Sequence, residues 1–253
     1  MVHFVGAGSG APDLITLRGA RLLGEADTVI YAGSLVNPAL LEYTKPGCEI
    51  HDSAKLTLEQ VLELIRAAER AGKTTVRLHT GDCSIYGAVR EQFDALDALG
   101  IDYDVCPGVS SFCGAAAALR TEYTLPEVSQ TVIITRAAGR TGVPERQSVA
   151  ALASHGATMV LFLSAGMTEK LREELLSGGC KPETPAAIVY KATWPGEERI
   201  FRCTVDTLPE TARENGIDRT ALIIVGDCMG EQYARSKLYD PRFSTGYRAA
   251  EKP

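Results

Sequence analysis

The chain has 253 residues, which suits one large or two smaller domains and allows a sizeable hydrophobic core. Apolar residues make up 45% and charged residues 23%, and the formal net charge of -6 disfavours a general nucleic-acid or anionic-membrane binder, which needs a basic excess. No apolar run approaches the roughly 20 residues of a membrane span, and the chain opens directly on a strand pattern, so we expect neither a membrane helix nor a signal peptide.

Cysteine usage indicates the redox compartment. Seven cysteines stand at positions 48, 83, 106, 113, 180, 203 and 228. The count is odd and no Cys-x-x-Cys pair occurs, which is typical of reduced thiols rather than of a small disulfide-stapled domain. The sequence therefore predicts a cytoplasmic protein.

The first element is a short apolar strand, Val2 to Val5, followed by the glycine-rich segment Gly6 to Ala11. This segment matches the G-x-G-x-x-A fingerprint of dinucleotide-binding proteins. A true NAD site also needs an acidic residue at the end of the second strand, to hold the ribose. The second strand, Thr28 to Tyr31, runs into Ala-Gly-Ser instead, and Pro12 interrupts the entry into the helix. An NAD-dependent oxidoreductase is therefore disfavoured and stays only as an alternative.

The chain is organised around a strand from Thr75 to His79 that ends in Thr80-Gly81-Asp82. Ligands of open α/β sheets bind at the carboxyl ends of strands, so we expect a ligand at Thr80 to Tyr86. Gly81 permits close backbone approach, and the carboxylate of Asp82 can accept hydrogen bonds from a ribose or attract a cation. The other reading is that Asp82 and Ser84 merely cap the next helix. That helix is marked by the apolar face Val89, Phe93, Leu96 and Leu99.

The remaining elements of the first half continue the alternation of strand and helix. We expect a short helix over Leu35 to Tyr43 that is broken by Pro38, and an amphipathic helix from Thr57 to Gly72. Ile101 to Val105 is a strand, and Pro107 to Phe112 is a strand-to-helix turn whose free N–H groups suit the polar edge of a ligand. The first half therefore predicts a doubly wound sheet.

The second half resumes the alternation after a link from Thr121 to Val128, but strands there also follow one another directly, which suggests a mixed sheet. We expect strands at 131–135, 159–163, 186–190, 198–205 and 221–225, and helices at 147–153, 169–176 and 208–215. The polar segment 232–253 is unpatterned and reads as an arm or a disordered tail. The predicted domains are 1–120 and 121–231, followed by this tail.

Few residues point to chemistry by local pattern alone. No serine lies in a G-x-S-x-G elbow, the four histidines lack metal-ligand spacing, and no P-loop is present. We interpret Cys83 as a packing residue and His79 as a strand histidine with its hydrogen bonds satisfied, rather than a base. Arg136, Arg140 and Arg146 form a basic loop, which is either simply solvated or a docking site for a polycarboxylate. Lys191 and Trp194 could add charge and a flat apolar face at another strand end.

Several separated motifs, in order, resemble one family. They are G-A-G-x-G-x-x-x-L-I-T (6–16), G-D-x-S-x-Y-G (81–87), P-G-V-S-S (107–111) and L-I-I-V-G (222–226). The chain is similar to the tetrapyrrole (uroporphyrin/precorrin) methyltransferases over nearly its whole length, to about Met229. Three further segments, 31–36, 131–141 and 189–195, are similar to the branch that methylates precorrin-4, or its cobalt-containing counterpart, at ring carbon C11.

The resemblance implies a protein of two α/β domains with a cofactor trough between them, the class III methyltransferase fold, usually as a homodimer. It implies S-adenosylmethionine as the methyl donor, S-adenosylhomocysteine as the product and no metal. The cofactor-binding residues it implies are Ser9, Thr80, Gly81, Asp82, Ile85, Tyr86, Ser110, Ser111, Ser164, Ala192, Thr220 and Ala221. The candidate substrate-binding residues are Arg136, Arg140, Lys191 and Trp194. Ser9 and Cys83 stand where the family usually has proline, so the turns lose a fixed φ but no ligand group.

The implied reaction is C11 methylation of precorrin-4 to precorrin-5 in cobalamin biosynthesis. The acceptor carbon is enamine-like, so alignment of donor and acceptor is the main task, and positioning can supply roughly 7–11 kcal/mol of a barrier. No catalytic base is assigned. The alternatives are an acceptor that carries cobalt, another ring position, and a non-catalytic tetrapyrrole or nucleotide carrier.

Overall fold

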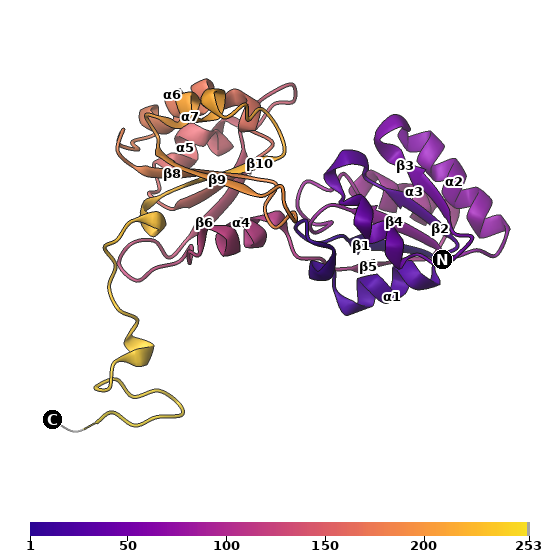
Figure 1. The fold of residues 1–253 in the computed structure, drawn as a ribbon, viewed down its shortest axis with the longest axis horizontal. Helices are drawn as coiled ribbons and strands as arrows, with labels where there is room; N and C mark the ends of the chain where they lie inside the picture. The colour runs from indigo at the N-terminus through magenta and orange to yellow at the C-terminus, as the bar shows by residue number, and fades with distance from the viewer. Residues whose placement is uncertain (252–253) are drawn as a thin grey trace. The chain divides into compact units, whose positions relative to one another are not determined.

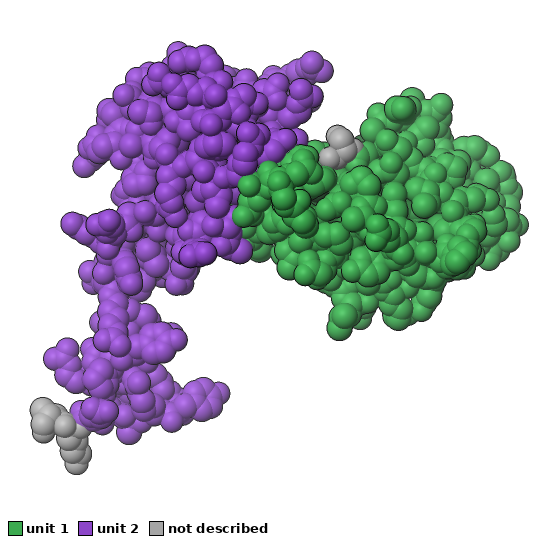
Figure 2. All heavy atoms as spheres, in the orientation of Figure 1, with its two compact units in different colours: residues 1–115, 191–198 green, residues 116–190, 199–253 purple. Residues whose placement is uncertain are grey.

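The computed structural model describes residues 1–251, apart from the side chain of Ser34. The chain forms two compact units: unit 1 contains Met1–Ala115 and Lys191–Glu198, and unit 2 contains Ala116–Tyr190 and the chain from Arg199 onward (Figure 2). The contacts thus divide the chain five residues before the predicted boundary at 120/121. They also place the segment 191–198 with unit 1, although it lies in the middle of the second half of the sequence.

Unit 1 is built on a five-stranded sheet in the order β3-β2-β4-β1-β5, in which all pairs are parallel (Figure 1). Its elements are β1 (Val2–Gly6), α1 (Leu17–Glu25), β2 (Thr28–Tyr31), β3 (Glu49–Asp52), α2 (Leu58–Arg70), β4 (Thr75–His79), α3 (Arg90–Leu99), β5 (Tyr103–Cys106) and the first half of α4 (Ser111–Leu119), whose residues from Ala116 onward belong to unit 2. Since β4, β1 and β5 are neighbours, the sheet order brings the carboxyl ends of these three strands side by side.

Helices cover both faces of this sheet. Leu22 and Leu23 of α1 pack with Val29 and Leu78 on one face. On the other face α2 and α3 pack against the opposite side chains of the same strands, with a core that includes Phe4, Ile30, Val61, Ile65 and Leu96. The alternation of buried side chains along β1 and β2 between the two clusters is the mark of a doubly wound sheet, and it confirms the fold class.

Local sequence signals explain where most helices begin and end, and where two predictions fail. α2 begins with a capping box between Thr57 and Gln60, and α3 ends at Gly100 in the left-handed conformation. Pro38 does not break a helix: it begins a 3-10 helix, Pro38–Tyr43, because a proline lacks only an N–H that the first turn leaves unpaired anyway. β3 was not predicted, since its sequence Glu-Ile-His-Asp is polar and it lies at the edge of the sheet.

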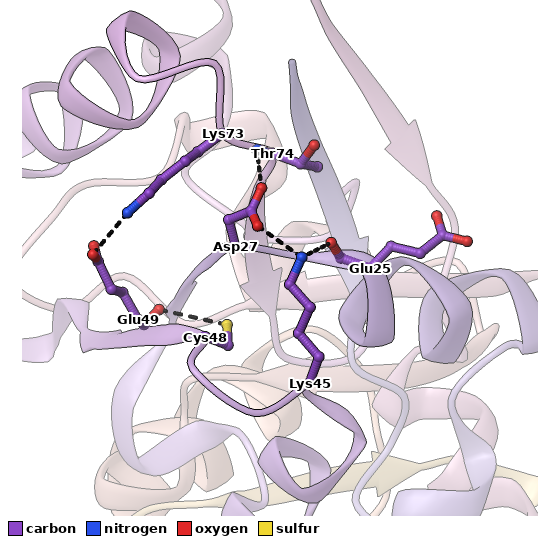
Figure 3. A network of polar contacts seen from close by, with 7 residues as sticks. All are labelled: Glu25, Asp27, Lys45, Cys48, Glu49, Lys73 and Thr74. Carbon is purple, nitrogen blue, oxygen red and sulfur yellow. Dashed lines mark hydrogen bonds and ion pairs between the residues drawn. The ribbon is translucent and has the colours of Figure 1, made fainter.

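Side-chain ion pairs hold the amino ends of the strands in unit 1 (Figure 3). The Lys45 ammonium donates to Asp27 at 2.7 Å and to the Glu25 carbonyl at 2.9 Å, while Asp27 also accepts from the Thr74 backbone N–H. Hydrogen bonding from Lys45 and Thr74 lowers the pKa of Asp27. These contacts tie the segments that lead into β2, β3 and β4, at the edge opposite the strands' carboxyl ends.

Unit 2 has a mixed sheet in the order β6-β7-β10-β8-β9, as the direct succession of strands suggested. Its elements are β6 (Val132–Arg136), α5 (Val149–Ala153), β7 (Thr158–Phe162), α6 (Thr168–Ser177), β8 (Pro185–Tyr190), β9 (Arg199–Thr204), α7 (Leu208–Glu214) and β10 (Ala221–Val225). α5, α6 and α7 cover one face around a core that includes Leu161, Leu171 and Ile188. On the other face, Arg202 of β9 donates to the carbonyl of Leu119 at the end of α4.

The C-terminal segment after the 3-10 helix Asp227–Met229 contains one further short 3-10 helix, Lys237–Tyr239, and is otherwise irregular through residue 251. The last two residues of the predicted tail lie outside the described part. Arg248 organises the segment by donating to the carbonyls of Leu238 and Asp240. Within residues 1–251, no helix combines the length and the apolar content that crossing a membrane requires.

Candidate functional site

The backbones of three glycines meet at the carboxyl ends of β1, β4 and β5. Gly6 ends β1, and Gly81 and Gly108 follow β4 and β5. A Cβ on Gly6 would lie 2.6 Å from the Gly108 Cα and 2.7 Å from the Gly81 carbonyl oxygen, and one on Gly108 would collide with the same oxygen. Glycine is therefore required here by close approach of backbone to backbone. The predicted ligand edge consists of main chain, with its N–H and C=O groups at hand.

Hydrogen bonds join these strand-end loops into one unit. Gly8 and Gly81 exchange two backbone hydrogen bonds, with N–O distances of 3.2 and 2.9 Å. Asp82 accepts from the Gly108 N–H at 2.7 Å through one carboxylate oxygen and from Ser84 through the other. Asp82 thus ties the β4 loop to the β5 loop. The capping interpretation fails, because the next helix, α3, begins only at Arg90.

The ionisation of Asp82 follows from these contacts. Partial burial opposes the charged form, but the hydrogen bonds from Ser84 and Gly108 outweigh it, so the pKa of Asp82 is lowered. A carboxylate with a lowered pKa and three internal donors is a weak base. Its geometry suits holding a loop in place rather than abstracting a proton.

The other predicted residues of this edge differ in exposure. Thr80 is exposed, Ile85 is half-buried, and Tyr86 is exposed with a left-handed φ of 54°. Ser110 is buried and Ser111 opens α4, and the hydroxyls of both make no hydrogen bond with any residue that the structure describes. These two hydroxyls, at the start of a helix, are free to contact a ligand.

Two side chains beside the loop are excluded from chemistry by burial. Cys83 packs in the core under the loop, where desolvation raises the pKa of its thiol to about 12, so it is a packing residue as predicted. His79 is 4% exposed, and burial, with the charge of Arg77, lowers its pKa to about 3. Its Nε2 has no hydrogen-bond partner among residues 1–251, so it is not the satisfied histidine that we expected. A neutral buried imidazole of this kind is no base at neutral pH.

The glycine-rich loop after β1 packs against the segment 191–198. The Ser9 hydroxyl lies 3.0 Å from the Thr193 hydroxyl, which also accepts from the Ala11 N–H at 3.2 Å. A Cβ on Gly10 would collide with the ring of Trp194 and lie 2.7 Å from the Ala192 carbonyl oxygen. The structure therefore brings the predicted residues Ser9, Ala192 and Trp194 together. Lys191 lies over the Trp194 ring and pairs with Glu197.

The strand register of unit 2 brings its predicted residues to one edge. Arg136 at the end of β6 pairs with Phe162 at the end of β7, two residues before Ser164. Ala221 at the start of β10 pairs with Tyr190 at the end of β8, and Thr220 directly precedes it. Leu163 and Thr220 have left-handed φ values of 53° and 54°. Such strained non-glycine residues cluster at functional sites, so this edge is a second candidate site region.

The side chains at this edge divide into those that hold the loop and those that are available. The Arg136 guanidinium donates to the carbonyls of Ala137, Thr141 and Gly142, so it closes its own loop. The Ser164 hydroxyl is fully buried; it accepts from the Ala137 N–H at 2.9 Å and donates to a backbone carbonyl. Arg140 is exposed and has no hydrogen bond or ion pair with any described residue. Arg146, in the short 3-10 helix Glu145–Gln147, is likewise exposed and makes no hydrogen bond or ion pair with a described residue, so Arg140 and Arg146 are both available cations.

Three functional contributions escaped the sequence analysis. Gly108 is the partner of Asp82, Thr193 holds the glycine-rich loop, and Asn37 donates its side-chain amide to the Gly10 carbonyl at 3.0 Å. Each partner is at least 26 residues away along the chain, so only the P-G turn and the strand end near Thr193 could have pointed to them.

The residues at the edge of unit 1 fit an adenosyl ligand. The glycine contacts allow close approach of the backbone, and the free serine hydroxyls and main-chain groups offer the polar partners that a ribose and an adenine need. A glycine loop that continues directly into a helix, as NAD binding uses, is not formed: a 3-10 turn at Pro12–Leu14 follows, and α1 begins at Leu17. In residues 1–251, no group of three or more metal-ligating side chains is placed to hold an ion. The fold and site define an α/β protein with a candidate ligand-binding edge at the strand ends of unit 1.

Comparison with known proteins gives the family. A model of the Tetrapyrrole (Corrin/Porphyrin) Methylases matches residues 1–209. The chain therefore belongs to the tetrapyrrole methylase family and is a methyltransferase, which confirms the resemblance drawn from its motifs.

Individual relatives match over nearly the whole chain. A cobalt-precorrin-4 C(11)-methyltransferase of Methanocaldococcus jannaschii is 51% identical, with 99% of this chain and 97% of the relative covered. A precorrin-4 C(11)-methyltransferase of Pseudomonas aeruginosa is 44% identical, with 99% of each covered. The solved structure of a cobalt precorrin-4 methyltransferase is 45% identical with a TM-score of 0.88, over 91% of this chain and 96% of that one.

Proposed function

We propose that this protein transfers a methyl group from S-adenosylmethionine to carbon C11 of precorrin-4, giving precorrin-5 and S-adenosylhomocysteine, in cobalamin biosynthesis. The observation that carries the proposal is the match, from end to end, to relatives named for C11 methylation of precorrin-4 or cobalt-precorrin-4. A uroporphyrin-III C-methyltransferase of Thermus thermophilus, 29% identical with a TM-score of 0.76 over 90% of this chain and 97% of that one, was solved with S-adenosylhomocysteine, which supports the cofactor.

The edge of unit 1 is the proposed cofactor site. The cofactor supplies an electrophilic methyl group on a sulfonium. Gly81 gives the backbone close access, Thr80, Ser110 and Ser111 offer hydroxyls, and Asp82 fixes the loops that present them. Because both carboxylate oxygens of Asp82 are already engaged, it acts by positioning. Ile85 and Tyr86 lie on the same loop, and Ser9 and Ala192 complete the proposed set in unit 1.

Catalysis without a protein base agrees with the side chains present. His79 is buried and neutral, Cys83 is a protonated thiol, and Asp82 is a weak base. An enamine-like ring carbon is itself a nucleophile, so the residues have to align it with the donor, which can supply roughly 7–11 kcal/mol of the barrier. Breaking the S–CH3 bond leaves a neutral thioether, and the new C–CH3 bond leaves the acceptor as an iminium, which then releases a ring N–H proton to solvent.

The edge of unit 2 is the proposed acceptor site. The peripheral carboxylates of a tetrapyrrole suit guanidinium groups, which bind carboxylates in a bidentate manner. Arg140 is exposed and unengaged and is the primary candidate, while Arg136 shapes the loop that carries it. Lys191 and Trp194, which belong to unit 1, form a cation–π pair and are further candidates for contact with the ring. Ser164, Thr220 and Ala221, at the strand ends of unit 2, remain proposed cofactor-binding residues.

Binding and product analysis test the function. Calorimetry should show S-adenosylhomocysteine bound in the micromolar range and no binding of NAD. A methyl-transfer assay on precorrin-4 should then give a product heavier by one methyl, located at C11 by NMR. Binding of NAD alone would restore the oxidoreductase alternative, and a methyl at another ring carbon would place the chain in another branch.

A cobalt-containing acceptor is the second candidate, because the relative at 51% identity is named for cobalt-precorrin-4. The two acceptors are compared by kcat/KM under the same conditions. A ratio above about tenfold, or 1.4 kcal/mol of discrimination, would identify the natural acceptor.

Arginine variants test the acceptor site. Arg140→Ala should raise the KM for the tetrapyrrole and leave binding of S-adenosylhomocysteine intact, and the double variant with Arg136→Ala should weaken the tetrapyrrole further. Arg213→Ala, on the exposed surface of α7, is the matched control and should change neither. Equal loss of both ligands in the Arg140 variant would contradict this division of roles.

We further propose a homodimer in the cytoplasm. The seven free thiols support a reducing compartment, and the family supports the dimer. Light scattering at several concentrations tests the dimer, and a single species of 27.1 kDa would rule it out.

A further inference from the structure

The loop between β8 and β9 is longer than its turn requires. The two strands form an antiparallel hairpin whose last pair is Tyr190 with Arg199, so eight residues, 191–198, connect them. Hairpin loops usually have two to five residues. These eight residues belong to unit 1, whereas both strands belong to unit 2. The extra length therefore serves a contact in unit 1.

That contact centres on one hydroxyl. The Thr193 Oγ1 lies 3.0 Å from the Ser9 Oγ and accepts from the Ala11 N–H at 3.2 Å. The Thr193 N–H in turn donates to Glu198 at 2.6 Å, which fixes the residue inside its own loop. Thr193 also lies against α4, since a Cβ on Gly114 would approach its methyl group to 3.2 Å and the Ser9 Cβ to 2.7 Å. Thr193 is thus held through its hydroxyl, its backbone N–H and its methyl group.

The backbone around this hydroxyl is strained. Lys191 and Thr193 have φ values of 46° and 64°, in the left-handed region that a β-branched residue such as threonine strongly avoids. Such strain persists only where the surroundings impose it, and it marks residues placed for a purpose. Here the imposed conformation points the threonine hydroxyl at the glycine-rich loop.

The glycine-rich loop passes this constraint to the proposed cofactor turn. Gly8, one residue before Ser9, exchanges both of its backbone hydrogen bonds with Gly81. Ser9 and Ala11 are held by Thr193, and Gly10 is held by Asn37 and Trp194. A chain of direct contacts therefore runs from Thr193 through residues 8–11 to Gly81.

We propose that Thr193 is a positioning residue whose hydroxyl fixes the glycine-rich loop and, through it, the Gly81 turn, and so sets the affinity of unit 1 for S-adenosylmethionine and S-adenosylhomocysteine. The proposal rests on the proposed function, because it assigns the cofactor to the Gly81 turn. It concerns the donor only, so the affinity for the tetrapyrrole should not depend on this hydroxyl.

Side-chain variants at one position separate the hydroxyl from the shape. Thr193→Val keeps the branched shape and removes the hydroxyl, Thr193→Ala removes both and relieves strain, and Thr193→Ser keeps the hydroxyl. We expect the Val and Ala variants to raise the calorimetric Kd for S-adenosylhomocysteine and the KM for the donor about tenfold, the loss of one to two net hydrogen bonds. The kcat at saturating donor and the KM for the tetrapyrrole should stay within about twofold of the unaltered protein, and the Ser variant should bind normally.

Two controls make the result specific. Thr44→Val removes a threonine hydroxyl that donates to the Leu41 carbonyl elsewhere in unit 1; it should lower the melting temperature without changing the Kd. A double-mutant cycle of Ser9→Ala with Thr193→Ala should give non-additive changes in binding free energy, because the two hydroxyls touch.

The outcomes distinguish this inference from the function on which it rests. If the unaltered protein binds no S-adenosylhomocysteine, the proposed function fails. If it binds and the Ala variant, folded by its melting curve, binds as tightly, the inference is overturned. It is also overturned if kcat falls while the donor KM stays unchanged, or if the Ser variant is as weak as the Ala variant.

Discussion

The two units present a strand-end edge of different construction. In unit 1 the edge is main chain: Gly6, Gly81 and Gly108 meet backbone to backbone, and Asp82 ties two of the loops. In unit 2 the edge is built from side chains, with Arg136 and Ser164 bonded to loop carbonyls and N–H groups. The first edge has no room for an added methyl group, whereas the second depends on polar atoms that must not be removed.

Sheet topology explains this difference. Three adjacent parallel strands of unit 1 deliver their carboxyl ends to one place, so three turns crowd together and only glycine fits. In unit 2 the antiparallel β10 lies between β7 and β8, so a strand start separates two strand ends and leaves space that side chains fill. The left-handed residues Leu163 and Thr220 lie at the sharp turns out of β7 and into β10.

A methyl group added to the edge of unit 1 gives the largest expected loss of stability, and one added to the edge of unit 2 serves as the comparison. Gly108→Ala would drive a Cβ into the carbonyl of Gly81, where backbone on both sides cannot give way, so we expect roughly 4 kcal/mol or more of destabilisation and loss of S-adenosylhomocysteine binding. The comparison variant is Gly142→Ala, in the basic loop of unit 2. The added Cβ would have no atom within 4 Å, so the free energy of unfolding should change by less than about 0.5 kcal/mol. Denaturant unfolding and calorimetry measure both. Equal tolerance at the two sites would remove the distinction between the edges.

The buried histidine of unit 1 gives the next effect, a dependence of stability on pH. The pKa of His79 is about 3 in the folded chain, against 6.5 for an ordinary histidine, so the unfolded chain binds the proton first as the pH falls. The stability that His79 contributes is therefore complete above about pH 6.5 and is lost on acidification towards pH 3. At about 1.4 kcal/mol per pH unit, the loss between pH 6.5 and pH 4 is about 3 kcal/mol.

The variant that isolates this effect is His79→Phe, which keeps a ring next to Phe4 and removes the titration. The difference in unfolding free energy between the variant and the unaltered chain should shift by about 3 kcal/mol in favour of the variant from pH 6.5 to pH 4. Parallel pH profiles for the two proteins would show that His79 keeps an ordinary pKa and is not sealed in the core.

Removing a polar atom from unit 2 has the smallest effect of the three. Ser164→Ala leaves the buried N–H of Ala137 without its acceptor, and we expect a loss of about 2 kcal/mol. The matched control is Ser154→Ala: its hydroxyl also bonds to backbone, but the side chain is exposed, so water replaces the bond and stability hardly changes. A Ser164 variant as stable as the control would show that this edge does not depend on the hydroxyl.

Local patterns were sufficient for most elements and failed where the local signal was weak. The strands Thr28–Tyr31 and Ala221–Val225 have the predicted bounds, because buried parallel or central strands are continuous apolar or β-branched runs. β3 was missed because an exposed edge strand can be polar, and the effect of Pro38 was misjudged because a proline at a first helical position starts a turn as readily as it ends one.

The candidate site also contains residues that local patterns predicted and contacts that they did not. The sequence alone indicated Gly81, Asp82 and the serines after Pro107, because turn residues after a strand have a local signature. The partners of these residues could not be read from the chain: Gly108 binds Asp82 across 26 residues, and Thr193 binds Ser9 across 184. The same limit applies to Arg136, which looked like a free cation and closes its own loop.

The sequence by itself determined the α/β class, the methyltransferase family and the turns at which a ligand is expected, since periodicity, glycines and ordered motifs are properties of the linear chain. Only the tertiary structure decided that β4, β1 and β5 lie side by side and that residues 191–198 join unit 1. The physical reason is that strand order and long-range hydrogen bonds depend on packing the whole core at once, and a contact between distant residues leaves little trace in either local sequence.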